Sequence, residues 1–229
     1  MSASEDCILN AQRPSPVSVR HVLGHLVPDA VLGALHRMLP GRIPAEGSGA
    51  LWNLHVSVRP QGGVAAARPG ARSAEVLLFN SGGMGARPLR DGPSTTAFPS
   101  GVQSMSIEAT EHVGPVIFWR KELRDGSGGL GRQRGGLGQV VEISASAGHE
   151  FHFNVMFDRM AHPPRGREGG ADGAAGAVRL DDGTVLAAKG RQHVPPERRL
   201  VLELPGGGGY GPVAERSAEA REEDRHYGY

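Results

Sequence analysis

The stretch LVLELPGGGGYG, residues 200–211, joins an apolar run to four consecutive glycines. Paired glycines also occur in FNSGGMGARP (79–88), SGGLGRQRGGLG (127–138) and PPRGREGGADG (163–173). The chain has 35 glycines among its 229 residues, about twice the usual share. Glycine loses more backbone freedom on folding than any other residue, so a folded chain this rich in glycine needs tight turns or close backbone approaches.

Between the glycine blocks, the apolar residues gather in short runs with polar punctuation, which is typical of buried strands joined by glycine-rich turns. Residues 138–145 and 150–157 are expected to pair as a hairpin, and a second hairpin is expected to turn at Asp181-Asp182-Gly183. Together the runs predict strands at residues 51–58, 74–80, 113–123, 138–145, 150–157, 178–180, 184–187 and 200–204.

Helical spacing is found near the two ends of the chain. Apolar residues three and four apart predict a helix over residues 17–26, and Pro28 suits the first turn of a second helix over residues 28–39. The charged tail from residue 212 predicts a further short helix. Residues 60–72 hold Pro, Gly, Ala and Arg and are expected to form a surface loop.

These patterns predict an α+β fold that is β-rich, with long glycine-rich loops and a short N-terminal helical segment. Residues 1–45 are expected to be a helical segment that continues from a missing N-terminal part of a longer protein, because no strand precedes its helices. Residues 46–211 are expected to form the β-rich region, and residues 212–229 a charged tail.

Composition narrows the classes of partner. The formal net charge is +1, so no bulk electrostatic field attracts the chain to nucleic acid or to an anionic membrane. Cys7 is the only cysteine, which excludes an internal disulfide and suits a reducing compartment. No apolar run approaches the roughly 18 residues of a membrane span, and no secretory signal is visible. The sequence predicts a soluble, cytoplasmic protein with no nucleic-acid or membrane partner.

Glycine-rich loops can hold phosphates by directing backbone N–H groups at an anion. The P-loop pattern is absent, and Gly129-Leu130-Gly131 followed by Gly135 is one residue off the dinucleotide fingerprint. The glycines are therefore interpreted as turns or backbone contacts, with a nucleotide cradle as the alternative. An arginine in such a loop can clamp a carboxylate or phosphate, or can simply bond loop carbonyls.

Two pairs of histidines have spacings relevant to metal binding. His21 and His25 are four apart on the expected helix and share a face, but no acidic or cysteine partner lies nearby in the sequence. His149 and His152 are three apart in an expected strand and point to opposite faces, so they are weak ligands for one ion. No metal ligand is assigned to this chain.

Taken in order, the glycine blocks resemble the C-terminal part of the hydantoinase B/5-oxoprolinase family, which includes N-methylhydantoinase B-like subunits. Any one block is weak, whereas five in the right order are specific, and they extend over nearly the whole chain. The five matching blocks are ILNAQRPSPVSVRH (8–21), FNSGGMGARPLRDG (79–92) with TAFPSGV (96–102) following, FWRKELRDGSGGLGRQRGGLGQ (118–139), PPRGREGGADGAAG (163–176), and LVLELPGGGGYG (200–211) with the terminal RHYGY (225–229).

The resemblance implies an ATP-dependent amidohydrolase that opens a small cyclic amide, such as 5-oxoproline, hydantoin or N-methylhydantoin. It implies two partners, a hydantoinase A-type subunit that carries the ATP site and the missing N-terminal half of the B-type subunit. ATP and a divalent metal are implied for the full complex, but no cofactor is assigned to this segment. The isolated chain is therefore expected to be inactive.

Two alternatives stay open, an acetone carboxylase-like subunit and a non-catalytic structural or interface segment. The sequence does not identify catalytic residues. The loops are instead expected to contact substrate or a partner subunit, with Arg87 and Arg134 pairing with a carboxylate or phosphate. The loop candidates are Gly82, Gly83, Gly85, Arg87, Asp91, Gly128, Gly129, Arg134, Gly135 and Gly136.

Overall fold

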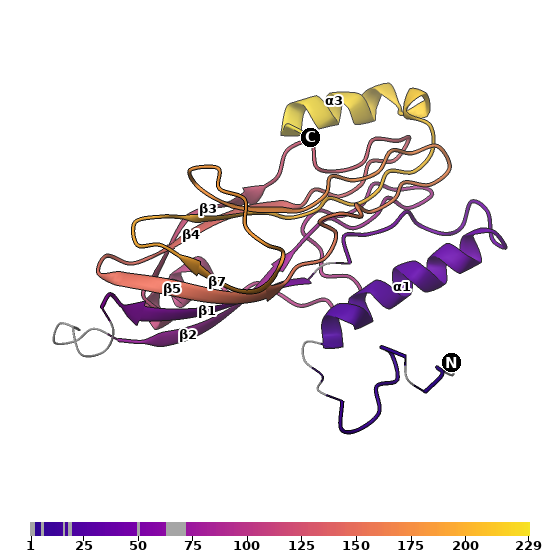
Figure 1. Cartoon of the computed structure of the whole chain (residues 1–229). Coiled ribbons are helices and arrows are strands. Elements are labelled where there is room, and N and C mark those ends of the chain that lie inside the picture. Colours follow the sequence, from indigo (N-terminus) through magenta and orange to yellow (C-terminus); the bar gives the residue numbers. More distant parts are fainter. Residues whose placement is uncertain (1–2, 6, 16, 18–19, 50, 63–71) are drawn as a thin grey trace.

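A two-sheet β-sandwich forms one end of the molecule, and long glycine-rich segments extend from it toward two helices (Figure 1). The computed structural model describes residues 3–5, 7–15, 17, 20–49, 51–62 and 72–229. In this part of the chain, two four-stranded antiparallel sheets and three α-helices confirm the predicted β-rich α+β class. The predicted division after residues 45 and 211 stays a prediction.

The first sheet has the strand order β2-β1-β5-β7, and every neighbouring pair is antiparallel. Along β1, Leu54, Val56 and Val58 are buried whereas His55 and Arg59 are exposed, so the predicted alternation is confirmed. The strands are β1 (Leu51–Pro60), β2 (Ala74–Ser81), β5 (His149–Met156) and β7 (Lys189–Val194).

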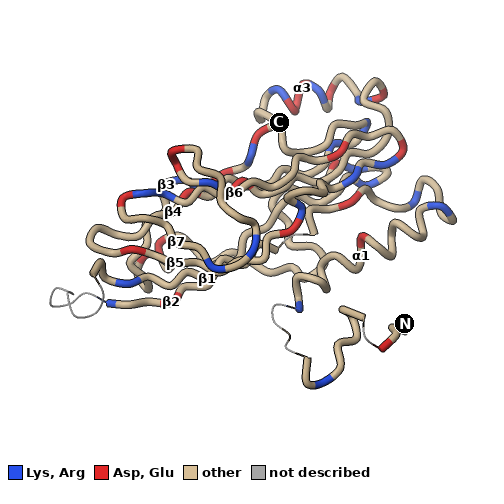
Figure 2. Tube along the Cα trace, in the orientation of Figure 1, with Lys and Arg blue, Asp and Glu red and all other residues tan. Residues whose placement is uncertain are grey.

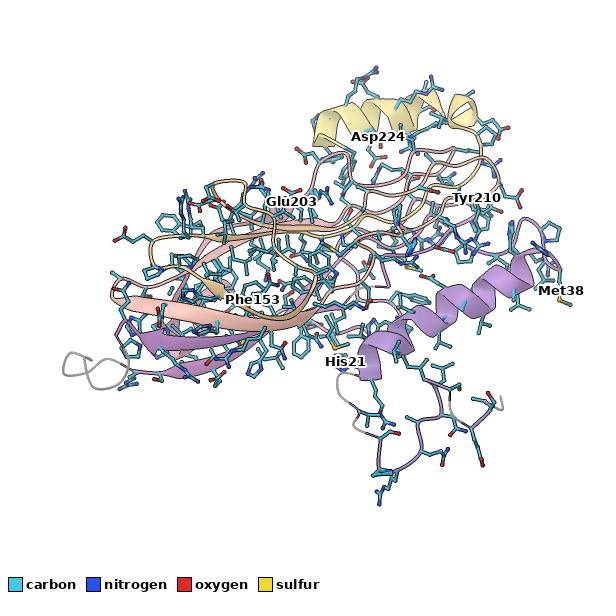
Figure 3. All side chains as sticks on the ribbon, in the orientation of Figure 1. His21, Met38, Phe153, Glu203, Tyr210 and Asp224 are labelled. Carbon is cyan, nitrogen blue, oxygen red and sulfur yellow. The ribbon has the colours of Figure 1, made fainter. Side chains whose placement is uncertain are left out.

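The second sheet has the order β3-β4-β8-β6, and the core lies between the two sheets. Trp52 stacks on Phe157 with ring centroids 4.2 Å apart, and Phe153 lies within the sandwich (Figure 3). Each such fully buried side chain stabilises the fold by about 1.5–3 kcal/mol. The strands are β3 (Val116–Leu123), β4 (Gln139–Ala145), β8 (Leu200–Glu203) and β6 (Ala177–Leu180).

The predicted hairpin of residues 138–145 with 150–157 is wrong. β4 pairs with β3 and β8 in the second sheet, whereas β5 pairs with β1 and β7 in the first. The turn itself exists, since the amide of His149 donates to the carbonyl of Ser146 and Gly148 has a φ of 79°. It crosses from one sheet to the other, so that the apolar faces of the two strands meet across the core.

The N-terminal helices differ from the prediction. One helix, α1 (Arg20–His36), contains Pro28 in its interior, where two helices were expected. Proline removes only one intrahelical hydrogen bond, and α1 lies along the glycine-rich segments, which hold it in place. The expected helix start at residues 17–19 falls in part outside the described residues.

Two elements were missed. The strand expected from residue 113 begins at Val116, because α2 (Ile107–Val113) precedes it, with the Ser106 hydroxyl accepting from the amide of Ala109 at 3.1 Å. Strand β7 reads KGRQHV and has no apolar alternation. It is the edge strand of the first sheet, and it forms because its backbone groups pair with those of β5.

Two other local expectations are confirmed, the turn at residues 181–183 and the helix in the tail. The turn at residues 181–183 forms, with Gly183 at a φ of 90° and the amide of Leu180 donating to the carbonyl of Thr184. Its second arm makes a bridge rather than a strand. The tail forms α3 (Ala218–Tyr227). The predicted loop at residues 60–72 lies mostly outside the described residues, and β1 reaches Pro60.

The glycine-rich segments pack side by side beyond the sandwich, with α1 and α3 on opposite sides of them (Figure 1). We call this layer the glycine bundle. Its segments are joined by backbone hydrogen bonds, such as Gly207 N to Gly136 O at 2.9 Å and Gly136 N to Met84 O at 2.8 Å. It comprises residues 44–48, 82–93, 127–138, 164–176 and 205–211.

The last of these segments is the centre of the bundle, and its hydrogen bonds repeat every three residues. The amides of Gly206 and Gly209 donate to the carbonyls of residues 174 and 171 on one neighbouring segment. The amides of Gly207 and Tyr210 donate to residues 136 and 133 on another, and that of Gly208 donates to Glu46 on a third. Three residues per turn without internal hydrogen bonds is the geometry of a polyproline-type helix, here made of glycine.

Gly207 and Gly136 of the bundle are required for space, whereas Gly169 and Gly211 have positive φ angles of 88° and 73°. A Cβ on Gly207 would lie 2.0 Å from the carbonyl oxygen of Met84, and one on Gly136 would lie 1.9 Å from that of Pro93. Neither residue is among the glycines with positive φ. The neighbouring backbone occupies the place where any side chain would begin.

Candidate functional site

The glycines predicted to contact substrate or a partner lie inside the glycine bundle. The amides of Gly83, Gly129, Gly135 and Gly136 each donate to a backbone carbonyl, so they are not free to hold a phosphate. This geometry is that of backbone contacts. The Cβ positions are taken by neighbouring backbone or by Ser48 for all seven candidates, Gly82, Gly83, Gly85, Gly128, Gly129, Gly135 and Gly136.

The three further candidates, Arg87, Asp91 and Arg134, lie in the glycine bundle. Arg87 donates from Nη2 to the carbonyl of Asp91 at 2.6 Å. Arg134 has a nearly buried side chain that donates to Asp224 of α3 at 3.4 Å, and its guanidinium lies 3.9 Å from the centroid of the Tyr229 ring. The roles of these residues toward substrate or partner stay predictions.

An ion-pair cluster, which we call the C-terminal clamp, ties α3 to the bundle. Arg216 is its centre, 6% exposed, and it donates to Asp91 at 2.9 and 3.0 Å and to Asp224 at 2.6 and 2.7 Å. Asp224 faces the bundle from α3 (Figure 3). The clamp consists of Asp91, Arg134, Arg216, Asp224 and Tyr229.

Replacement Asp91→Asn is expected to lower the free energy of unfolding by about 2 kcal/mol at pH 7, because it removes charge-assisted hydrogen bonds to Arg216. Burial alone would raise the pKa of Asp91, but hydrogen bonds from Arg216 and the Arg134 amide, with both guanidinium charges, lower it. The stabilisation is therefore present above the unfolded pKa of about 3.9 and is lost as the pH falls through the folded pKa. Urea unfolding from pH 7 to pH 3 should show the two proteins converging at acid pH; a constant difference would contradict this account.

A pocket of about 650 Å³ opens where α1 meets the glycine bundle. Acidic and basic residues are intermixed along the chain (Figure 2), and several of both kinds meet here. We call it the α1 pocket. It is lined by Leu26, Asp29, Ala30, Glu46, Asp158, Arg159, His162, Pro163, Arg165 and Asp172.

Arg159 joins two buried carboxylates at the α1 pocket. Its guanidinium donates to Asp29 of α1 at 2.6 Å and to Glu46 of the bundle at 3.0 Å. Arg165 donates to the same Glu46 from its backbone amide, at 3.1 Å, and from its side chain, at 2.6 and 2.8 Å. The side chains of Asp29, Glu46 and Arg159 are 12%, 4% and 13% exposed, so water screens the two ion pairs of Arg159 little.

The carboxyl groups of the α1 pocket differ in pKa. Burial raises the pKa of Asp29, and the charge of Arg159 opposes this only in part. Burial also raises the pKa of Asp158, against the charges of Lys189 and Arg159. For Glu46, burial is outweighed by the hydrogen bonds and charges of Arg165 and Arg159, and its pKa is lowered. Carboxyl groups with separated pKa values are suited to distinct proton-donor and charge-holding roles.

Arg159 is also conformationally strained. Its φ is 60°, in the left-handed region, and its Nε is buried without an acceptor among the described residues. Strain of this kind, of order 1–3 kcal/mol, persists where the surroundings over-determine a residue, and it clusters at functional sites.

Beside Arg159, Asp158 has only Lys189, 3.9 Å away, as an ion-pair partner among the described residues. Asp158 is thus available to a ligand.

Sequence reasoning missed this pocket. Arg165 lies in the glycine-rich stretch 163–173 without a motif of its own, and no motif indicates Asp29, Glu46, Asp158 or Arg159. The pairs Asp29–Arg159 and Glu46–Arg159 join residues 130 and 113 positions apart, so no local spacing records them.

The α1 pocket does not fit the divalent metal expected for the family's complex. Its most buried carboxylates, Asp29 and Glu46, are neutralised by Arg159 and Arg165, and a cation there would have to displace a guanidinium. The candidate glycine amides, which already donate to backbone carbonyls, likewise offer no binding site for the phosphates of ATP.

Within the described residues, no helix combines the length and apolar character needed to cross a membrane.

Comparison with known proteins gives consistent relatives. A family model described as hydantoinase B/oxoprolinase matches residues 1–213. The chain is 28% identical to a D-/L-hydantoinase B-type protein of a Pseudomonas species, over 95% of this chain and 36% of the relative, and 34% identical to 5-oxoprolinase 1 of Arabidopsis thaliana, over 57% and 10%. The crystal structure of an ATP-dependent caprolactamase from Pseudomonas jessenii shares the fold, with a TM-score of 0.84 and 24% identity over the whole of this chain and 40% of that one.

Proposed function

Because the chain belongs to the hydantoinase B/oxoprolinase family, we propose that it works as the C-terminal part of a B-type subunit in the ATP-dependent hydrolytic ring opening of a cyclic amide. The chain spans well under half of the length of the relatives above, so the remaining residues of the site are supplied by the rest of such a protein and by an A-type subunit. Candidate substrates are 5-oxoproline, hydantoin and N-methylhydantoin. In this proposal ATP is held by the A-type subunit and supplies the phosphoryl group that activates the unreactive amide carbonyl.

The observation that carries the role of this chain is the strained Arg159 at the α1 pocket, beside Asp158. A cyclic amide presents an N–H donor and a carbonyl acceptor on a small ring. Asp158, with its raised pKa, can donate to the carbonyl when protonated and accept from the ring N–H when ionised. His162 lines the same pocket and offers a second polar contact.

The test reconstitutes the chain with the N-terminal part of a B-type subunit and with an A-type subunit. Ring opening of one of the three cyclic amides, dependent on ATP, is expected only in the complete mixture. Ring opening by the purified chain alone, or none by a mixture whose three components co-purify, would overturn the proposal. Carboxylation of acetone by the same mixture would instead support the acetone carboxylase-like alternative.

Within the active mixture, Asp158→Asn is expected to lower kcat about ten- to a hundredfold, because it removes the proton-transfer capacity while keeping the shape of the side chain. The matched control is Asp182→Asn in the turn after β6, whose carboxylate lies outside the pocket and accepts from the amide of Thr184. Equal kcat values for the two variants would remove Asp158 from the reaction. The thermal unfolding midpoints of both variants should stay close to that of the original chain.

A further inference from the structure

The outer face of the first sheet brings together three metal-ligand side chains, independently of the function proposed above. His152 of β5 pairs directly with His193 of β7 in the antiparallel register, and their ring centroids lie 4.7 Å apart. Glu150 lies two residues before His152 and therefore on the same face of β5. Its Oε2 is 3.5 Å from the Nε2 of His193.

The separation of these groups suits a single ion. One ligand atom from each of the three residues lies within 4.8 Å of the other two. Zinc bonds of about 2.0–2.2 Å at tetrahedral angles place ligand atoms about 3.4 Å apart, so small side-chain rotations close the site. The backbone need not move, because the register of β5 and β7 already sets the positions of both imidazoles.

We propose that Glu150, His152 and His193 bind one zinc ion. Two imidazoles and one carboxylate are a donor set that zinc accepts, and three protein ligands leave the fourth position open for water or a ligand group. The face is accessible in this chain, with the His193 side chain 40% and the Glu150 side chain 29% exposed.

Nearby charge favours an imidazole-binding metal over magnesium or calcium. Arg59 is opposite Glu150 in the register of β1 and β5, and Arg191 precedes His193 by two residues on β7. Both guanidinium groups repel a cation, so only an ion with strong bonds to imidazole nitrogen overcomes them. The hard cations, which prefer an all-oxygen set, are disfavoured here.

Sequence patterns indicated only half of this arrangement. They assigned His149 and His152 to opposite faces, and the structure agrees, since His152 lies in the outward row whereas His149 is paired with the buried Pro60. The second imidazole is His193, on the strand that the apolar pattern did not reveal.

The experiment titrates zinc into the tag-free, chelator-treated full chain in competition with a chromophoric chelator. One equivalent is expected to bind, and cobalt(II) in place of zinc should give visible absorption bands. His152→Ala and His193→Ala are each expected to weaken zinc binding at least tenfold, and Glu150→Gln to weaken it with the shape of the side chain preserved.

The matched control is His55→Ala, a change on β1 at the same outer face of the first sheet. His55 also lies beside a carboxylate, with its Nε2 3.2 Å from Glu75, but it belongs to no three-ligand cluster among the described residues. Its removal should leave zinc affinity unchanged. Binding of less than one equivalent, or equal affinity in the His193→Ala chain, would show that Glu150 and His193 form a surface ion pair only. Tryptophan fluorescence confirms that each variant is folded, since Trp52 is buried in the core.

Discussion

The Gly207→Ala chain is expected to be unfolded, or to lose at least about 4 kcal/mol of its free energy of unfolding, as measured by urea titration with tryptophan fluorescence. The added methyl carbon would lie 2.0 Å from the carbonyl oxygen of Met84, 2.3 Å from its carbonyl carbon and 2.7 Å from the amide nitrogen of Gly85. All three are backbone atoms, so no rotamer change relieves the overlap. The central segment would have to move away from its neighbours and break the hydrogen bond from Gly207 to Gly136.

Two other glycines separate space from backbone conformation. Gly126 has a φ of 64° and open space around its Cβ position, so Gly126→Ala should lose only about 1 kcal/mol through the left-handed backbone. Gly24 lies in α1 with nothing within 4 Å, and Gly24→Ala should gain about 0.5–1 kcal/mol through helix propensity. If Gly207→Ala resembles Gly126→Ala, close packing is not the reason for glycine in the bundle.

The bundle shows why the glycine pattern predicted a family and a fold class but not an architecture. The paired glycines predicted close backbone contacts, and Gly207 and Gly136 make such contacts. Nothing in the local sequence says that residues 136 and 207 are partners, however, because a glycine has no side chain whose polarity could mark its neighbour. The three-residue period in the donors from Gly206 to Tyr210 becomes visible only when the segments around them are known.

The strands were predictable where one face is buried and the other exposed, as in β1. β7 lacks that contrast, and its pairing is carried by backbone groups. The two apolar runs on either side of Ser146 fit a hairpin and a corner between two sheets equally well. The core that the apolar faces of both strands share decides between these two arrangements. The α1 pocket was unpredictable for a similar reason, since Arg159 meets Asp29 and Glu46 only after α1 packs on the bundle.

The Glu46→Gln chain is expected to lose about 3 kcal/mol of its free energy of unfolding at pH 7, because the change leaves buried guanidinium charge with less compensation. Glu46 accepts from both Arg159 and Arg165, and its side chain is 4% exposed. Its lowered pKa gives the sign of the pH dependence. The contribution is present above the unfolded pKa of about 4.3 and is lost as the pH falls through the folded pKa, so the two chains should converge toward pH 3.

Asp29 acts with the opposite sign, because its pKa is raised. Its contribution is fully present below its unfolded pKa of about 3.9 and is lost as the pH rises through the folded pKa. Arg159 donates to both Asp29 and Glu46 and so offsets this loss of stability. These three residues should therefore behave as one coupled network. In a double-mutant cycle, Glu46→Gln combined with Arg159→Gln should lose at least about 1 kcal/mol less than the sum of the single changes.

A partly exposed glutamate with two arginine partners provides the matched control. Glu203 of β8 is 23% exposed, with Arg179 at 2.8 Å and Arg124 at 3.6 Å. Glu203→Gln should lose about 1 kcal/mol or less, since Arg179 is 35% exposed to water and Arg124 keeps its hydrogen bonds to the carbonyls of Ala175 and Leu204. A loss at Glu46 no larger than this, with additive effects in the cycle, would mean that Arg159 is held in its left-handed conformation by the chain path alone. A large and coupled loss makes the ion-pair network the element that fixes the strained residue at the α1 pocket.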